Sequence, residues 1–379
     1  MNIAKHLLSD KQESPVADLS TLINLAESSK VQYRQKIPDS QKLIDAHSES
    51  RYPQSAVALE IVENAVIVCA HRTIAAYYPN GQPITSCQIG NTKRARNIKN
   101  IRKRLDLKGS MALFTTLAPE CYYHWLLDTV PGLEVLDAAG VSFENIDHFY
   151  FSNYCQNFQS ETLSNYGIDS TKVFSTFTDV KHSKENILHA KIDKLLIPRF
   201  RDLEGGWPNQ WIAPNLQSRF DVSRYWNDAS TSSENRKIYI TRGTSRRRVI
   251  NEEELLPFLA NEGFQLVDMN KLSLLDQIET VARADVICGP HGAGLATAIF
   301  ARPGATLIEF CGAYLTRHFR ITAEIAGLNY QVFGAGVDRD GRPLIVSNQV
   351  ADRSVNYLVD KKLVELQLSK LTSDSCTKT

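Results

Sequence analysis

Four arginines follow the first strand predicted in the C-terminal half of this 379-residue chain: Arg242, Arg246, Arg247 and Arg248. Guanidinium groups bind a diphosphate through paired hydrogen bonds and stabilise the charge on a departing phosphate. These residue types therefore fit a site for a phosphorylated ligand. A solvated surface cluster is the alternative, because most surface arginines face water. That alternative has more force for Arg246 than for Arg242, which stands at the strand end.

A glycine-rich turn follows the third predicted strand, in the sequence GPHGAGL at residues 289–295. Glycines at the start of a helix let the backbone approach a ligand, and free N–H groups and the helix dipole favour negative charge there. The turn predicts a phosphate-binding loop of four residues: His291, Gly292, Ala293 and Gly294. A turn that only permits close packing of a strand and a helix is the alternative.

A carboxylate, Glu309, ends the fourth predicted strand after the sequence PGATLI. At that position it can accept a hydrogen bond from a ribose or sugar hydroxyl. A structural salt bridge to one of the arginines is a second interpretation, which the sequence leaves open.

A histidine and an aspartate stand four residues apart in the N-terminal half, within CYYHWLLDTVPGL. A helix there places His124 and Asp128 on one face. An imidazole oriented by a carboxylate is a suitable general base, because its ordinary pKa lies near neutral pH. A buried structural pair is the alternative, since Trp125, Leu126 and Leu127 surround the two residues in the sequence.

These residues need a scaffold, and the C-terminal half alternates regularly between strands and helices. The predicted strands are KIYIT, FQLVD, ADVICG, ATLIEF and NYQVFG, and a helix is expected between each pair. Apolar strands separated by helices predict an open, doubly wound parallel sheet. Ligands of such sheets bind at the carboxyl ends of the strands, where the arginines, the glycine turn and Glu309 all fall.

The N-terminal half has a different pattern, with short β-branched and aromatic runs over residues 56–89. Asn80-Gly81 predicts a hairpin turn between two of these runs, and thus a small antiparallel meander. A helix is expected over 121–139 and another near 215–226. The predicted organisation is a peripheral arm at 1–50, an acceptor-side α/β domain at 51–230, a Ser- and Asn-rich linker at 227–236, and a nucleotide-sugar-binding Rossmann-like domain at 236–379.

The overall charge singles out no class of partner, because the formal net charge is only +1. Residues 93–108 contain eight lysines and arginines. We interpret them as a solvated helix face or linker and exclude nucleic acid, because no aromatic residue is interleaved for base stacking. A peripheral contact with an anionic membrane stays open. The absence of a long apolar run predicts a cytoplasmic protein, with a possible peripheral place at the inner face of the membrane.

No metal site is expected, because the seven cysteines are scattered and form no Cys/His spacing typical of zinc. The sequence Asp338-Arg-Asp-Gly341 resembles a metal-binding DxD motif. We interpret it as the turn of a hairpin, because apolar runs flank it on both sides.

Taken together, YYHWLLD, ITRGTSRRRVINEEEL and ADVICGPHGAGLATAIFARPGATLIEF resemble glycosyltransferase family 61, over roughly residues 121–310. This family contains bacterial capsule and lipopolysaccharide enzymes, plant xylosyltransferases and animal O-linked N-acetylglucosaminyltransferases, and a bacterial surface-polysaccharide member is expected. The resemblance implies a GT-B architecture of two facing Rossmann-like domains and an inverting reaction. It implies no metal and no cofactor, with the nucleotide sugar as co-substrate.

The resemblance also assigns roles to residues. Arg242, Arg247 and Arg248 match the family's donor-phosphate arginines. His291, Gly292, Ala293 and Gly294 match its donor loop, and Glu309 matches the acidic end of its PGAxxIE strand. His124 and Asp128 match an H-x-x-x-D pattern on the acceptor side. The first 110 residues carry no family signature, which leaves recognition of the acceptor unassigned.

The expected function is transfer of a hexosyl or pentosyl group from a nucleotide sugar to a glycan or lipid-linked glycan, in the synthesis of a surface polysaccharide. A non-catalytic sugar-nucleotide-binding or scaffold subunit of a polysaccharide complex is the alternative. The His124 and Asp128 pair argues against that alternative, because binding alone requires no general base.

Overall fold

The computed structural model describes residues 57–70, 72–101, 103–116, 118–176, 187–200, 208–226, 236–312, 316–333, 336–337, 356–362, 364–365 and 368. The expected arm at 1–50, the linker up to residue 235 and the DxD sequence at 338–340 lie outside this part of the chain.

The N-terminal sheet has the strand order β3-β2-β1-β7-β4-β5-β6. Its strands are β1 (Ala58–Ala70), β2 (Thr73–Tyr77), β3 (Pro83–Gly90), β4 (Leu105–Leu113), β5 (His148–Phe151), β6 (Val173–Ser175) and β7 (Leu188–Arg199). The hairpin between β2 and β3 is confirmed, with Gly81 at a φ of 84° in its turn. The meander does not stand alone, because β1 also pairs along its length with β7, which comes much later in the chain. Strands β7, β4, β5 and β6 form a parallel group.

The predicted helix over 121–139 is in fact two helices, α4 (Tyr122–Asp128) and α5 (Val130–Ala138). They separate at Thr129, and Pro131 in the first turn of α5 lacks the N–H that a continuous helix needs. The helix expected near 215–226 is likewise divided, into α7 (Ile212–Arg219) and α8 (Ser223–Trp226), with Asp221 at a φ of 47° between them. The other helices of this half are α3 (Thr92–Ile101), α6 (Asn157–Asn165) and the short 3₁₀ turns η2 (Phe143–Asn145) and η3 (Ser170–Lys172).

The C-terminal sheet is parallel throughout and has the order β12-β11-β10-β8-β9. Its strands are β8 (Lys237–Ile240), β9 (Phe264–Val267), β10 (Val286–Pro290), β11 (Thr306–Phe310) and β12 (Asn329–Phe333). Their connections contain α9 (Glu252–Asn261), η5 (Met269–Lys271), α10 (Leu274–Ala282), η6 (Ala293–Phe300) and α11 (His318–Ile325), and a two-stranded ribbon joins β13 (Gly336–Val337) to β14 (Leu358–Val359). A helix was expected at GLATAIF and is present as η6, a 3₁₀ helix, a type that an apolar run does not specify.

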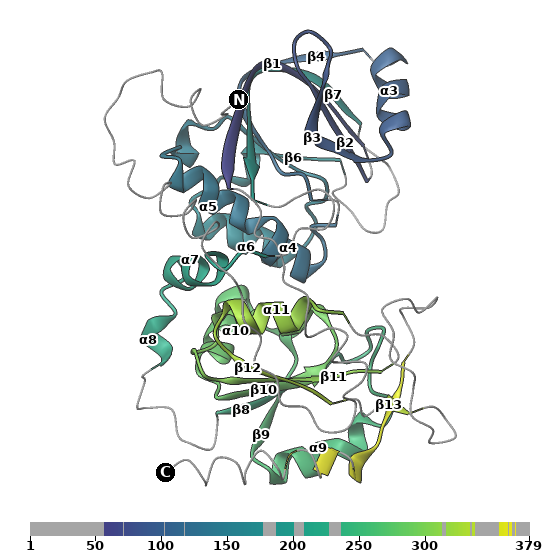
Figure 1. Ribbon diagram of the computed structural model, residues 1–379, viewed down its shortest axis with the longest axis vertical. Coiled ribbons are helices and arrows are strands. Elements are labelled where there is room, and N and C mark those ends of the chain that lie inside the picture. Colours follow the sequence, from purple (N-terminus) through teal and green to yellow (C-terminus); the bar gives the residue numbers. More distant parts are fainter. Residues whose placement is uncertain are drawn as a thin grey trace.

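Both faces of the C-terminal sheet are covered, which confirms the predicted doubly wound parallel sheet. Ile238 and Ile287 face the core shared with α10, whereas Tyr239 and Cys288 face the core shared with α9. Figure 1 shows α9 on the outer face and α10 and α11 on the face toward the N-terminal half. The protein is therefore a mixed α/β structure with two sheets that both contain parallel strands.

Helices form the layers between the two sheets, with α4 to α7 on one side and α10 and α11 on the other (Figure 1). A single apolar cluster runs through these layers and includes Trp125 of α4 and Phe300 of η6. Gln217 Nε2 donates to the carbonyl of Ile299 at 2.7 Å, and Trp226 Nε1 donates to that of Phe300 at 3.2 Å. These bonds fix α7 and α8 against the C-terminal half, and α4 packs against η6 in the shared cluster. Within the described ranges, no helix combines the length and the apolar composition needed to cross a membrane.

Candidate active site

The order of the C-terminal sheet reverses between β8 and β10, because β9 lies on one side of β8 and the later strands lie on the other. A reversal of this kind opens a crevice at the carboxyl ends of the two strands, where open α/β sheets bind their ligands. Arg242 follows β8 at this point, and His291 follows β10. The structure thus brings two predicted donor-binding residues together at the switch point.

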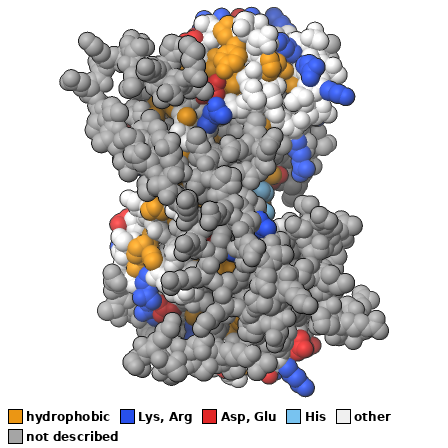
Figure 2. Space-filling model, viewed as in Figure 1, with side chains coloured by type: hydrophobic (Ala, Val, Ile, Leu, Met, Phe, Trp, Pro, Cys, Tyr) orange, Lys and Arg blue, Asp and Glu red, His pale blue; other side chains and the backbone are white. Residues whose placement is uncertain are grey.

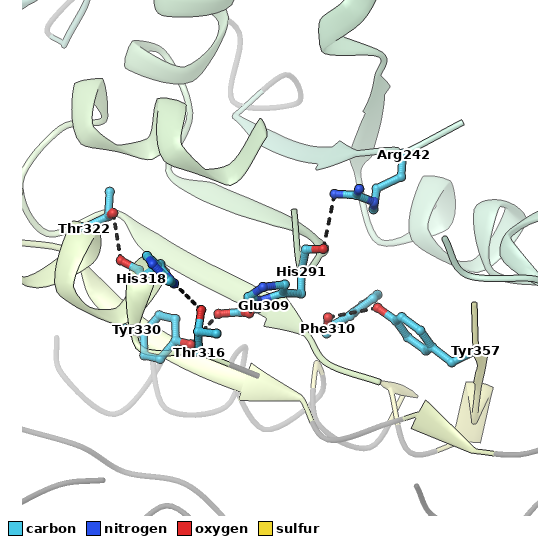
Figure 3. A network of polar contacts seen from close by, with 9 residues as sticks. All are labelled: Arg242, His291, Glu309, Phe310, Thr316, His318, Thr322, Tyr330 and Tyr357. Atoms are coloured by element: carbon cyan, nitrogen blue, oxygen red, sulfur yellow. Dashed lines mark hydrogen bonds and ion pairs between the residues drawn. The ribbon is translucent and has the colours of Figure 1, made fainter. Parts of the chain in front are cut away.

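Arg242 reaches across this crevice to the carbonyl of His291, as Figure 3 shows, and it also binds the backbone of its own loop. Its Nη1 donates to the carbonyl of His291 at 3.2 Å, and its Nε donates to the carbonyl of Arg246 at 2.7 Å. Gly292 makes the approach possible, because a Cβ at that residue would lie 1.4 Å from Nη1 of Arg242. The glycine in the turn therefore permits the close approach of a cation as well as of a ligand.

The charge of Arg242 has no acidic partner among the described residues, since both of its hydrogen bonds go to carbonyls. Burial and the neighbouring charge of Arg247 lower the pKa of Arg242 to about 10. A half-buried cation without a counterion is costly, and an anion bound beside it relieves that cost. The electrostatics at this point favour a negatively charged ligand.

A cleft of about 1350 Å³ opens beside Arg242, between the two halves of the chain. Predicted donor residues form part of its lining: Arg242, Arg247, Gly292, Ala293 and Gly294. The opposite wall comes from the N-terminal half and includes Tyr122 and Gln156. Arg246 also lines the cleft but is exposed, whereas Arg248 is outside the lining and its N–H is bound to Asn356.

His291 and Glu309 form a buried pair behind the cleft wall, joined through Nδ1 of the histidine and Oε1 of the glutamate. Their side chains are 6% and 0% exposed. The hydroxyl of Tyr330 donates to the second oxygen, Oε2 of Glu309 (Figure 3). Burial and the Glu309 charge raise the pKa of Tyr330 well above its usual value, so this phenol keeps the proton that it donates.

In this geometry both carboxylate oxygens of Glu309 have partners in the protein, His291 at Oε1 and Tyr330 at Oε2, so Glu309 orients His291. Its partners are not arginines, although a salt bridge to an arginine was the competing interpretation of the sequence. The pair fixes the imidazole of His291, and thereby the backbone carbonyl to which Arg242 is bound. Sequence reasoning missed Tyr330, because pairing across β11 and β12 depends on strand register.

The predicted pair on α4 is confirmed as a contact, with 2.6 Å between His124 Nδ1 and Asp128 Oδ2. The carboxylate is nearly buried, with 9% of the Asp128 side chain exposed, whereas His124 is 38% exposed. A proton on Nδ1, held by the carboxylate, leaves Nε2 with a lone pair that can accept a proton from a hydroxyl group. The arrangement can remove a proton from a bound hydroxyl.

α4 begins at the cleft and meets α11 of the C-terminal half. Tyr122 lines the cleft, and the next ring, Tyr123, lies 4.6 Å from His318 and 5.8 Å from Phe319 between centroids. Phe319 in turn lies 5.0 Å from the ring of His291. Aromatic contacts therefore connect the residue next to His124 with the donor loop. The ring of His318, a residue that the sequence did not single out, lies 6.4 Å from the ring of His124 between centroids.

Divalent cations have no evident site in the part of the chain that the structure describes, where no three His, Cys, Asp or Glu side chains gather as ligands. Similarity to known proteins indicates the kind of reaction. The family described as Glycosyltransferase 61 matches residues 122–308, a range that contains α4, the arginines and the glycine turn.

Curated relatives are similar to parts of this chain. An EGF domain-specific O-linked N-acetylglucosamine transferase of Drosophila melanogaster is 31% identical over 101 residues, which cover 26% of this chain and 19% of the relative. A beta-1,2-xylosyltransferase of Arabidopsis thaliana is 33% identical over 102 residues, covering 23% and 19%. A protein O-linked-mannose beta-1,4-N-acetylglucosaminyltransferase 2 of Tetraodon nigroviridis is 29% identical over 116 residues, covering 30% and 19%.

The matched segments span about a fifth of the length of these relatives. All three relatives are transferases of sugars from animals or a plant, so they do not bear on the expected bacterial type. The family match and the relatives agree with each other and with the motifs. Through residues 122–308, this chain therefore belongs to glycosyltransferase family 61.

Proposed function

We propose that this chain transfers a sugar from a nucleotide-sugar donor to a glycan acceptor, with inversion at the anomeric carbon. The observation that carries the proposal is a cleft with two unlike walls. One wall presents Arg242, a cation without an acidic partner among the described residues. The other wall contains the start of α4, the helix that bears the pair of His124 and Asp128.

The donor diphosphate binds in this proposal at the switch point. Arg242 and Arg247 contact its oxygens, and the N–H groups of Gly292, Ala293 and Gly294 face it from the turn. Charge that develops on the leaving diphosphate is stabilised by these fixed groups, a role that metal ions fill in other transferases. Arg248 contributes through its backbone, and Glu309 contributes by orienting His291.

The reaction is a single in-line displacement. His124, oriented by Asp128, takes the proton of an acceptor hydroxyl at Nε2. The hydroxyl oxygen forms a bond to the anomeric carbon as the bond from that carbon to the phosphate oxygen breaks, and the electron pair leaves with the nucleoside diphosphate. One displacement from the face opposite the leaving group inverts the anomeric centre.

A GT-B arrangement, with two Rossmann-like domains facing a central cleft, is part of the proposal. The parallel group of strands in each half and the position of the cleft between the halves support it. The acceptor is proposed to be a growing or lipid-linked glycan of a surface polysaccharide. The transferred unit is proposed to be a hexosyl or a pentosyl group.

Donor binding is expected to need no divalent metal ion. A thermal-shift panel of nucleotide sugars in excess EDTA should contain at least one compound that raises Tm, because a ligand at a hundred times its Kd stabilises the folded state by about 2.7 kcal/mol. The same compound should be turned over in EDTA. Turnover that disappears in EDTA and returns with manganese would contradict metal independence.

A binding or scaffold subunit without catalysis is the rival function. Such a protein would give the same thermal shift, but no nucleoside diphosphate would be released in the presence of any glycan acceptor. Release of the diphosphate therefore separates the two functions.

A peripheral membrane contact through residues 93–108 is a further part of the proposal. Helix α3 carries no acidic residue, and its apolar residues Ala95 and Ile98 are buried against the sheet. Its basic residues Lys93 and Arg96 are exposed, and Lys and Arg side chains gather on this flank in Figure 2. Leu105, 50% exposed, follows directly after Lys103 and Arg104. Basic residues around an exposed apolar side chain suit an anionic bilayer surface.

Sedimentation with vesicles tests this contact. Binding to phosphatidylserine vesicles is expected to exceed binding to phosphatidylcholine vesicles and to weaken with salt, since each basic residue near the surface contributes about 1 kcal/mol. The double variant Lys93→Glu with Arg96→Glu should lose the preference. The double variant Lys361→Glu with Lys362→Glu, on the distant C-terminal segment, is the matched control. Equal binding of the Lys93→Glu, Arg96→Glu variant and the unaltered protein would refute the contact.

A further inference from the structure

A segment near the C-terminus lies against the loop that carries the arginines. We name residues 356–359 the C-terminal strap and residues 241–250 the arginine loop. The backbone N–H of Tyr357 donates to the carbonyl of Arg248 at 3.2 Å, and the N–H of Ile250 donates to the carbonyl of Tyr357 at 2.8 Å. Val249 and Tyr357 thereby form an isolated parallel bridge. The strap therefore binds the backbone of the arginine loop at Arg248 and Ile250.

Side chains add to this attachment. The N–H of Arg248 donates to Oδ1 of Asn356 at 3.2 Å. Asn251, the residue after the arginine loop, forms a closed pair with Val359, because its Nδ2 donates to the Val359 carbonyl and its Oδ1 accepts from the Val359 N–H, both at 2.9 Å. The chain is therefore held from Arg248 to Asn251.

The backbone of the arginine loop needs such support. Arg247 has a φ of 62°, in the left-handed region of the backbone that residues other than glycine and asparagine rarely adopt. A strained residue keeps this conformation only where the surrounding structure over-determines it. The strap bonds begin at the very next residue, Arg248, so they fix the backbone that directs the Arg247 side chain into the cleft.

The side chain of Tyr357 extends the attachment to the second loop of the site (Figure 3). Its hydroxyl donates to the carbonyl of Phe310 at 2.9 Å, and the same carbonyl accepts the backbone N–H of His291 at 2.8 Å. The phenol ring packs on Gly312, where a Cβ would lie 2.5 Å from a ring carbon. Burial raises the pKa of Tyr357 well above its usual value, so the hydroxyl stays a donor.

We infer that Tyr357 is a positioning residue for the donor-phosphate site, because it ties the arginine loop to the His291 turn. Its backbone holds Arg248 and Ile250, and its hydroxyl shares the Phe310 carbonyl with His291. Arg242 closes the connection between the same two loops from the cleft side. The strap lies beyond residues 122–308, so this support comes from outside the family match. The inference rests on the proposed function for its consequence, which is donor affinity.

The variant Tyr357→Phe tests the inference, since it deletes one hydroxyl and keeps the ring. The Kd for UDP or GDP, measured by calorimetry, should rise about fivefold, the effect of losing one ordinary hydrogen bond. kcat at saturating donor should stay within about twofold. Hydrogen exchange of the peptide covering residues 242–250 should become faster in the absence of any ligand.

Tyr150→Phe is the matched control. It deletes a buried hydroxyl that contacts Thr176 at 3.1 Å in the N-terminal half, so it imposes a similar loss of stability far from the arginine loop. Its Kd and the exchange of residues 242–250 should equal those of the unaltered protein. A second variant, Asn356→Ala, removes the acceptor of the Arg248 N–H and should resemble Tyr357→Phe in both measurements.

The positioning role of Tyr357 and the proposed function can fail separately. Unchanged Kd and unchanged exchange in Tyr357→Phe would overturn the positioning role. If the unaltered protein binds neither UDP nor GDP nor any nucleotide sugar, the proposed function fails and the effect on donor affinity fails with it. Faster exchange in Tyr357→Phe would then still show that the strap supports the loop.

Discussion

His124→Ala is expected to lower kcat by about a hundredfold or more and to leave the Kd for the donor within about twofold. General-base catalysis contributes factors of about 10² to 10⁴, and this substitution removes the base entirely. The donor should still bind, because His124 is not part of the cleft lining that carries Arg242 and Arg247. The measurement is release of nucleoside diphosphate at saturating donor, with calorimetry for the Kd.

Asp128→Asn should have a similar effect for a different reason. The amide can donate to Nδ1 of His124 and favour the tautomer with its proton on Nε2, which leaves no lone pair for the acceptor hydroxyl. Since the two side chains serve one step, the double variant should be little worse than the worse single variant.

His148→Ala is the control for these two variants, because His148 lies at the start of β5, in the N-terminal sheet, and its Nε2 contacts the carbonyl of Lys108. Its turnover should be unchanged. Near-normal turnover in His124→Ala would show that the pair with Asp128 is structural. The neighbouring His318 would then be the next residue to test as the base.

The parallel sheet and its loops were predictable from the sequence for a physical reason. Strands buried on both faces read as continuous apolar runs, so ADVICG and ATLIEF could be recognised without knowledge of their neighbours. Once the strands are known, topology places the residues after β8 and β10 at one edge. That is why Arg242 and His291 could be assigned to one site.

Partners across strands and segments could not be predicted in the same way. The bond of Glu309 to His291 depends on the register of β10 against β11, in which Gly289 pairs with Glu309. No local pattern specifies that register, and the sequence therefore left Glu309 with two interpretations. Tyr357 and Asn356 contact residues more than a hundred positions earlier in the chain, so no motif reveals them.

The division of one predicted helix into α4 and α5 also matters for the site. Proline in the first turn of α5 was visible in the sequence, but the apolar pattern continues across the break. Because α4 ends at Asp128, the pair with His124 spans nearly the whole helix. Thr116 and Thr129 then hold its end, since their hydroxyls donate to the carbonyls of Asp128 and His124.

Arg242→Ala is expected to weaken donor binding about a hundred- to a thousandfold. Loss of a charge-assisted contact to two phosphate oxygens in a partly desolvated cleft costs about 3 to 4 kcal/mol. The free protein should keep its Tm within a few degrees, because the lost hydrogen bonds to two carbonyls are offset by removal of a half-buried cation without an acidic partner among the described residues.

Arg247→Ala should have an effect in the same direction, and Arg246→Ala is the matched control for both. All three side chains line the cleft, but Arg246 is exposed and offers Arg242 only its backbone carbonyl, which the substitution retains. Calorimetric titration with the donor should therefore give a Kd near that of the unaltered protein for Arg246→Ala. Equal affinities in all three variants would contradict the assignment of the diphosphate to Arg242 and Arg247.

Gly292→Ala tests the same contact without deleting a charge. The new Cβ would meet Nη1 of Arg242 at 1.4 Å, so the guanidinium must move away from the His291 carbonyl. We expect a smaller loss of affinity than for Arg242→Ala, about tenfold, because a flexible side chain can partly recover its position.

The pKa of Arg242 provides an independent check of its role in donor binding. Since burial lowers it to about 10, donor affinity in the unaltered protein should fall as pH rises through 10, whereas Arg242→Ala should lack that decline.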